Sequence, residues 1–225
     1  AGALGLVAEL LDGLGQQAAG FLVARLGEHQ LVENLGREQI LALRDQRLAI
    51  LDDLLLDLNA VSAEVIAPLF RADHGLEDKG HPGWFDPVTI ADKGAEAAIR
   101  KLISERFPEH GVIGEEYGED RPDAEFVWVL DPIDGTVSFA AGVPLFGTLI
   151  ALEHGDEVVA GICAFPALSE RLWAVRGAGA WWERTDLAGV RSRVAARVRR
   201  CTRLRDALIT TTGLERSDGD TFSWT

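Results

Sequence analysis

The chain has 225 residues, a formal net charge of -14 and 47% hydrophobic residues, a composition typical of a globular protein with enough apolar content for a core. The acidic excess argues against nucleic acid and against an anionic membrane surface as partners, because clustered Lys and Arg attract both. Cys163 and Cys201 are the only cysteines and lack metal-ligand spacing, so we expect two buried free thiols in a reducing, cytoplasmic setting.

Residues 1–37 predict one or two helices interrupted by glycine. We expect no targeting or membrane-spanning segment here, because no basic region precedes the apolar stretch. In addition, Glu9, Asp12 and Gln16 interrupt the stretch well before it reaches the length that spans a bilayer.

A longer helix is predicted from about residue 38 to about residue 70, because apolar residues recur at spacings of three and four. The stripe consists of Leu48, Leu51, Leu55, Leu58, Val65 and Leu69. It is wider than the two-position seam of a coiled coil, which favours a packing helix over a coiled-coil partner surface. Residues 71–84 break the periodicity with Gly and Pro and predict a loop.

A second helix is predicted from Thr89 to about Phe107. Thr89 can act as its N-cap, and Asp92 lies in its first turn. The run "GVIG" then predicts a short strand that ends at Glu115 and Glu116. The run "FVWVL" is continuously apolar, as expected for a buried strand, so the stretch "DPIDGT" follows a strand end.

Residues 145–182 contain three or four strand-like runs separated by "HGD", "PALS" and "RGAG". These separators are typical of hairpin connections, so we predict an antiparallel meander. The "GAG" stretch is interpreted as a turn rather than a nucleotide-binding loop, because no helix follows it.

Arginines are dense from Arg184 to Arg205, although the chain as a whole is acidic. We expect a solvated helix face here, with an anion-binding patch as the alternative. Residues 207–212 ("ALITTT") predict one more strand.

The acidic residues that follow the predicted strands fit a Mg2+ site if they converge. Mg2+ prefers oxygen ligands in near-octahedral geometry and retains waters, so a few convergent carboxylates suffice. Asp131 and Asp134 can point the same way on a tight turn, which Pro132 stiffens. A surface turn is the alternative, because turns favour Asp, Pro and Gly. If Gly135 and Thr136 open a helix, their backbone N–H groups suit a phosphate.

No rival arrangement for nucleophilic or zinc chemistry is present in the sequence. There is no Gly-x-Ser-x-Gly segment, and the cysteines lie in apolar or basic surroundings. The five histidines show no ligand spacing, so each is interpreted as structural or exposed.

The chain resembles the Mg2+-dependent inositol monophosphatase superfamily over roughly residues 45–212. Three signatures stand in order: "DPVTIAD" (86–92), "GEE" (114–116) and the highly specific "WVLDPIDGT" (128–136), which is followed by Phe139. The stretches "FDPVTIAD", "FPEHGVIGEE" and "PLFGTLIAL" resemble the bacterial histidinol-phosphate phosphatase branch more than the animal inositol enzymes.

The resemblance implies ligands for two or three Mg2+ ions. These are Glu115, Asp131, the backbone carbonyl of Ile133, and Asp134, with Asp131 as the bridge between ions. Lys79 loosely matches a basic residue that the family often has near the site.

The resemblance also implies catalytic and substrate-binding residues. Asp92 and Thr136 match the pair that orients and deprotonates the attacking water. Gly135, Thr136 and Glu115 are expected to bind the substrate.

The implied fold is α/β, with alternating helix and sheet layers, an antiparallel sheet that carries the motif, and a second sheet that is incomplete. Residues 1–44 are expected to form a helical extension of unknown role. Residues 45–225 are expected to form the inositol monophosphatase-like domain without its C-terminal part, because the family's Trp-Asp aspartate has no match here. Asp218 and Asp220 do not fit that motif.

The implied activity is Mg2+-dependent hydrolysis of a small phosphate monoester by metal-activated water. Histidinol phosphate, in histidine biosynthesis, is the first candidate, and inositol 1-phosphate or a related sugar phosphate is the alternative. A third hypothesis is a truncated, inactive relative that acts as a binding module through its Leu-rich N-terminal helices. A homodimer is left open.

Overall fold

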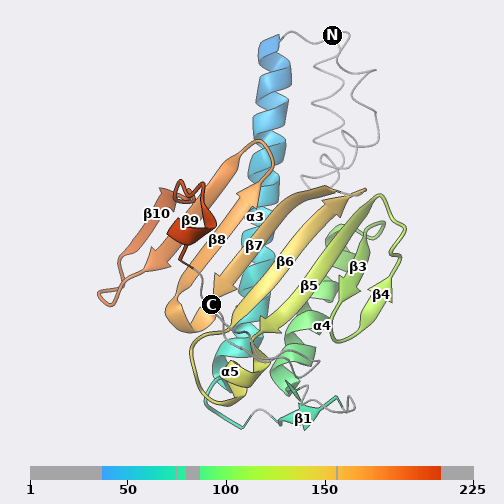
Figure 1. Cartoon of the computed structure of the whole chain (residues 1–225). Coiled ribbons are helices and arrows are strands. Elements are labelled where there is room, and N and C mark those ends of the chain that lie inside the picture. The colour runs from blue at the N-terminus through green and yellow to red at the C-terminus, as the bar shows by residue number, and fades with distance from the viewer. Residues whose placement is uncertain (1–36, 74, 80–86, 156, 209–225) are drawn as a thin grey trace.

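The computed structural model describes residues 37–73, 75–79, 87–155 and 157–208 (Figure 1). Its helices are α3 (Arg37–Leu69), α4 (Ile90–Arg106) and the short α5 (Thr136–Ala140). A small sheet consists of β1 (Glu77–Asp78) and β2 (Pro87–Val88). The large sheet contains β3 (Gly111–Gly114), β4 (Gly118–Asp120), β5 (Phe126–Asp134), β6 (Gly147–His154), β7 (Glu157–Phe165), β8 (Glu170–Val175), β9 (Gly179–Thr185) and β10 (Arg191–Ala195).

The large sheet has the order β10-β9-β8-β7-β6-β5-β3-β4. Every neighbouring pair is antiparallel except β3 and β5, which are parallel. The predicted α/β class and mostly antiparallel sheet are therefore confirmed, and the parallel pair next to the motif is an addition that the sequence analysis did not contain.

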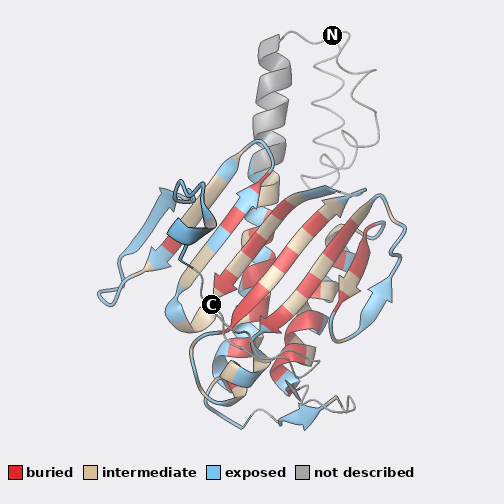
Figure 2. Ribbon diagram, viewed as in Figure 1, coloured by how far each residue is buried: buried red, intermediate tan, exposed pale blue. Residues whose placement is uncertain are grey.

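The core lies between the sheet and a layer formed by α3 and α4, which cross behind it in Figure 1. In this layer Leu55 and Leu58 of α3 and Ile99 of α4 are fully buried. They belong to one cluster with Trp128 and Trp173 of the sheet. Figure 2 shows the buried residues concentrated in the central strands and in the helix faces beside them.

Both predicted helices are confirmed, and so is the meander, which consists of β6 to β9. The expected helix face from Arg184 to Arg205 is wrong: residues 191–195 form the edge strand β10. The reason lies across the sheet, where Arg193 is the register partner of Glu183 and both Arg191 and Arg193 pair with that carboxylate. A cross-strand partner of this kind leaves no periodicity in the sequence.

The expectation of two buried thiols is also wrong, because Cys163 is only partly buried and Cys201 is exposed. Residues 1–36 and 209–212, where further helices and a strand were predicted, lie outside the described residues. The helix α3 is continuous across residues 44 and 45, and the domain boundary there stays a prediction. Within the described ranges, no helix is long and apolar enough to cross a membrane.

Truncation of Leu58 tests whether α3 is part of the core. Its side chain is 0% exposed, so Leu58→Ala should lower the free energy of unfolding by about 2–5 kcal/mol through lost burial and a residual cavity. Urea denaturation followed by circular dichroism measures this loss. Leu187→Ala is the matched control, because Leu187 is fully exposed and its loss should stay within about 0.5 kcal/mol. Equal losses in the two variants would contradict the packing of α3.

Candidate functional site

The parallel pairing of β3 and β5 brings two predicted acidic groups together. Parallel strands end at the same edge of a sheet, and the register pairs Gly114 with Leu130. The next residue, Glu115, donates its backbone N–H to the carbonyl oxygen of Leu130 at 3.2 Å. Glu115, which follows β3, therefore lies beside Asp131 of β5. The expectation that Asp131 follows a strand end is wrong, because β5 continues to Asp134.

The first turn of α4 supplies Asp92 to the same edge. Thr89 is the N-cap in a capping box: its backbone N–H donates to Asp92 Oδ2 at 2.8 Å, and its hydroxyl donates to the same oxygen. Asp92 is 2% exposed. Its other oxygen, Oδ1, lies 3.2 Å from the hydroxyl of Thr136, so the predicted catalytic pair is in contact.

The segment that carries Asp131 and Asp134 is anchored between them. The register of β5 against β6 shifts between these two residues, and the side chain of Ile133 is 1% exposed. Ile133 packs in an apolar cluster that includes Phe139 and Phe146. Thr148 of β6 donates its hydroxyl to the carbonyl oxygen of Pro132 at 2.8 Å. The two aspartates thus flank a fixed apolar residue, rather than lying on a free surface turn.

Gly135 and Thr136 open a helix as predicted, although α5 is only five residues long. Gly135 has φ 92°, and a Cβ there would lie 3.1 Å from the carbonyl oxygen of Leu145, so both the backbone angle and the space require glycine. The Thr136 hydroxyl lies 3.0 Å from the carbonyl oxygen of Ile133. One hydroxyl hydrogen therefore serves either this carbonyl or Asp92.

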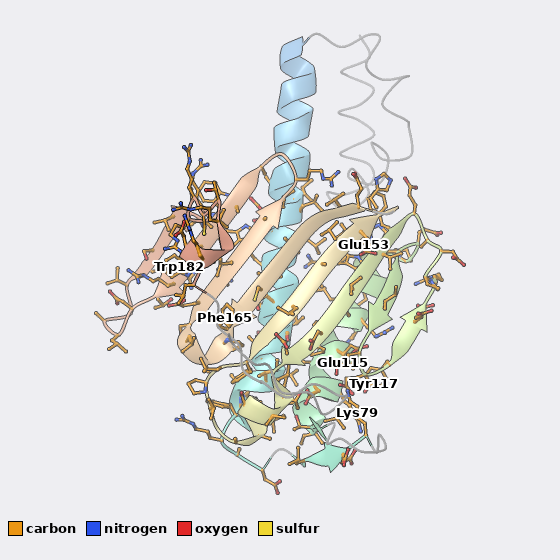
Figure 3. All side chains as sticks on the ribbon, in the orientation of Figure 1. Lys79, Glu115, Tyr117, Glu153, Phe165 and Trp182 are labelled. Carbon is orange, nitrogen blue, oxygen red and sulfur yellow. The ribbon has the colours of Figure 1, made fainter. Side chains whose placement is uncertain are left out.

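Lys79 follows β1 and reaches the end of β3, where Figure 3 shows it beside Glu115 and Tyr117. Its Nζ lies 2.8 Å from Glu115 Oε1 and 2.8 Å from Glu116 Oε1. Burial alone would lower the pKa of Lys79, but the hydrogen bonds and charges of the two glutamates outweigh it and raise the pKa. Lys79 therefore stays protonated and supplies a positive charge to this acidic edge.

The charge of Lys79 does not balance Asp131. Burial raises the pKa of Asp131 most, and the neighbouring Glu115, Asp134 and Asp92 add to the rise, so that the pKa reaches about 7. Its Oδ1 is buried without a hydrogen-bond partner among the described residues. A buried carboxylate oxygen without a partner, surrounded by other carboxylates, is the environment that a bound cation stabilises.

The donor set fits Mg2+, because carboxylate and carbonyl oxygens are the ligands that this ion prefers. The oxygens in question belong to Glu115, Asp131, Asp134 and the carbonyl of Ile133. In the part of the chain that is described, no group of three such side chains is arranged closely enough to hold an ion as it stands, and Glu115 is in contact with Lys79 instead. A bound cation would compete with Lys79 for Glu115.

An apolar hollow of about 510 Å³ lies on the large sheet next to this edge. Asp131 is its acidic lining residue, and the remainder is mainly apolar, including Leu149, Cys163 and Leu172. Such a lining offers few donors to a phosphate group, so the polar cluster at the strand ends is the better candidate for phosphate chemistry.

Glu96, which lies one helical turn after Asp92 and is 0% exposed, was not predicted as a functional residue. Its carboxylate accepts the backbone N–H groups of Glu116 and Tyr117, at 2.8 Å and 3.2 Å. The available signal was the four-residue spacing from Asp92, which places both side chains on one face of α4. A buried acidic residue requires a partner, and the sequence alone does not identify that partner.

Comparison with known proteins agrees with this geometry. Residues 49–223 match the model of the inositol monophosphatase family. The bifunctional phosphatase IMPL2 of Arabidopsis thaliana is 40% identical over 67% of this chain and 41% of its own length. A histidinol-phosphatase of Chlorobaculum parvum is 50% identical over 42% of this chain and 37% of its own length. The chain thus matches less than half the length of these relatives.

One solved structure has a similar fold. An inositol monophosphatase and NADP phosphatase, complexed with Mg2+ and phosphate, superimposes with a TM-score of 0.53 at 25% identity. The match covers 59% of this chain and 50% of that one.

The raised pKa of Asp131 predicts a specific pH dependence of stability without metal. Because the pKa moves from 3.8 to about 7 on folding, the folded state holds more protons than the unfolded state in that window, so this group destabilises the fold progressively as pH rises through it. The stability of Asp131→Asn relative to wild type should therefore increase from about pH 4 to about pH 7 and then level off.

Urea denaturation in EDTA measures this difference. His110, whose pKa burial lowers to about 4, contributes an opposite trend, but it does so in both proteins and cancels in the comparison. Mg2+ added at pH 8 should stabilise wild type more than the variant. A stability difference that does not change with pH would contradict the predicted titration of Asp131.

Proposed function

The chain belongs to the inositol monophosphatase family, and on that premise we propose that it hydrolyses a small phosphate monoester with the help of Mg2+. The family and the relatives named above are phosphatases. The observation that carries the proposal is the buried, unpartnered oxygen of Asp131 at an edge where Glu115, Asp134 and Asp92 also raise its pKa. That arrangement favours a bound cation, and a cation at this position can assist the hydrolysis of a phosphate ester.

In this proposal Mg2+ would be held by Glu115, Asp131, Asp134 and the Ile133 carbonyl, the oxygens that meet at this edge of the sheet. When bound, Mg2+ lowers the pKa of a coordinated water and stabilises negative charge on the phosphate and on the leaving oxygen. The protein's own part is to orient and deprotonate. Asp92 is fixed by Thr89 on one oxygen and faces the Thr136 hydroxyl with the other, so it can accept a proton that the water gives up to Thr136.

Burial raises the pKa of Asp92 above the ordinary 3.8, and the hydrogen bonds from Thr89 and Thr136 limit that rise. A carboxylate with a raised pKa is a stronger base once it is ionised. Gly135 and Thr136, which open α5, are assigned to the phosphate group, with Glu115 as a further contact near the substrate. These assignments rest on the contacts described above and on the resemblance of the motifs.

Histidinol phosphate is the preferred substrate, because the "FDPVTIAD", "FPEHGVIGEE" and "PLFGTLIAL" stretches resemble that branch and a histidinol-phosphatase is among the similar relatives. Inositol 1-phosphate or a related sugar phosphate is the second candidate, because the family is named for it. A role in histidine biosynthesis, a cytoplasmic location and a homodimeric state stay predictions.

Release of inorganic phosphate tests the activity directly. The purified chain should release phosphate from L-histidinol phosphate faster than from inositol 1-phosphate with Mg2+, and EDTA should abolish release from both. Asp134→Asn should reduce Mg2+-dependent turnover to background, because it removes one negatively charged ligand, while the circular dichroism spectrum stays unchanged.

Asp123→Asn is the control, because Asp123 is an exposed aspartate outside the site and should retain wild-type turnover. An unchanged rate in Asp134→Asn would refute the site assignment. An inactive chain that still binds Mg2+ would favour the truncated, non-catalytic hypothesis.

Adding the C-terminal portion of a relative then distinguishes a non-catalytic protein from a phosphatase whose site is incomplete in this chain. If the chain is inactive by itself, restored turnover after this addition would show that the site needs residues outside this sequence.

A further inference from the structure

One face of α4 connects two parts of the site. Asp92, Glu96 and Arg100 are spaced four residues apart, so they lie one above another along that face. Asp92 belongs to the proposed catalytic pair. Glu96 and Arg100 contact the segment that carries Glu115, which arrives from a different part of the chain.

We propose that Glu96 is a positioning residue that holds Glu115 in place for Mg2+, an inference that rests on the proposed function. The two backbone N–H groups immediately after Glu115 are those of Glu116 and Tyr117. Glu96 Oε2 accepts the first at 2.8 Å, and Oε1 accepts the second at 3.2 Å. A carboxylate that binds two consecutive N–H groups fixes the direction in which the chain leaves Glu115.

Gly114, the residue before Glu115, is shaped to the same carboxylate. A Cβ at Gly114 would lie 1.9 Å from Glu96 Oε1, far inside any allowed contact. The glycine therefore lets Glu96 approach the backbone from inside the turn between β3 and β4. Glu96 thus contacts the chain on both sides of Glu115.

Arg100 completes the arrangement and makes it selective for a charged carboxylate. Its Nε donates to Glu96 Oε1 at 2.7 Å, and its Nη2 donates to the carbonyl oxygen of Gly118 at the far side of the turn. The side chain of Glu96 is 0% exposed and that of Arg100 is 19% exposed. A buried carboxylate is costly unless donors surround it, and here the donors are those of the Glu115 segment and of Arg100.

The same helix therefore sets the position of Asp92 directly and that of Glu115 through Glu96. The turns of α4 are packed into the core by Ala91, Ala95 and Ile99, each 0% exposed. This packing gives the base and the metal-binding carboxylate one rigid frame, so a shift of the Glu115 segment against α4 would change the site without unfolding the protein.

Glu96→Gln tests the inference with almost no change in size. The amide of Gln presents its NH2 group to at least one of the donors that the carboxylate accepts, namely the N–H groups of Glu116 and Tyr117 and the guanidinium of Arg100. We expect faster amide hydrogen exchange in residues 111–120 of the metal-free protein. We also expect the Mg2+ dissociation constant, from calorimetric titration without substrate, to rise by about 10- to 100-fold.

Glu183→Gln is a matched control. Glu183 is a buried glutamate, 7% exposed, whose Oε1 lies 2.5 Å from Nη2 of Arg171, and it lies on β9 at a distance from the site along the sheet. The control should lose stability in the same way but retain the exchange rates of residues 111–120 and the Mg2+ affinity of wild type. This separates positioning from the general cost of breaking a buried ion pair.

A double-mutant cycle shows whether Glu96 acts through Glu115. Glu115→Gln should weaken Mg2+ binding, and adding Glu96→Gln to it should cause little further loss. If Glu96→Gln fails to fold, Arg100→Met, which removes the guanidinium at similar length, should change exchange and affinity in the same direction.

Two kinds of result separate the inference from the function on which it rests. Wild-type affinity in Glu96→Gln, additive losses in the cycle, or unchanged exchange in residues 111–120 would overturn the positioning role alone. A wild-type chain that binds no Mg2+ would overturn the proposed function, and the inference with it.

Discussion

The parallel register between β3 and β5 is the constraint on which the site depends. It places Glu115 next to Asp131 by pairing Gly114 with Leu130, and the backbone hydrogen bond from Glu115 to Leu130 continues the ladder by one residue. Because side chains alternate between the two faces of a strand, a slip of one residue would turn Glu115 away from its neighbour. Burial is the largest cause of the raised pKa of Asp131, and the repulsion from Glu115 that adds to it is a direct result of this register.

The helix α4 supports that register from behind. Its first turn is fixed by the capping box at Thr89, directly after β2. Its buried face packs against β3 and β5 in the main core cluster. Asp92 and Glu96 therefore have related roles, since each carboxylate accepts backbone N–H groups, Asp92 that of Thr89 and Glu96 that of Glu116. The acidic groups converge because helix capping, core packing and strand pairing each fix one of them.

Local patterns in the sequence predicted α3, α4 and the β6–β9 meander, because periodicity and turn residues act over short distances. The capping box at Thr89 and the helix opening after Gly135 were predictable for the same reason. The parallel pairing of β3 with β5, the strand β10 and the role of Glu96 depend instead on partners in another element, which a local pattern does not identify. Arg193 illustrates this point: its helical interpretation fails because its partner, Glu183, lies on a neighbouring strand.

The position of α3 at the start of the described chain affects how the protein is made. Trp173 donates its indole N–H to Asp52 of α3 across a separation of 121 residues, and Ser62 of α3 lies 3.4 Å from Thr148, 86 residues further on. At a synthesis rate of about 5–20 residues per second, roughly 10 s pass before the ribosome has produced the strands that cover Leu55 and Leu58. During that interval these strands cannot yet cover the apolar side of α3, so we expect its docking on the sheet to be a late step of folding.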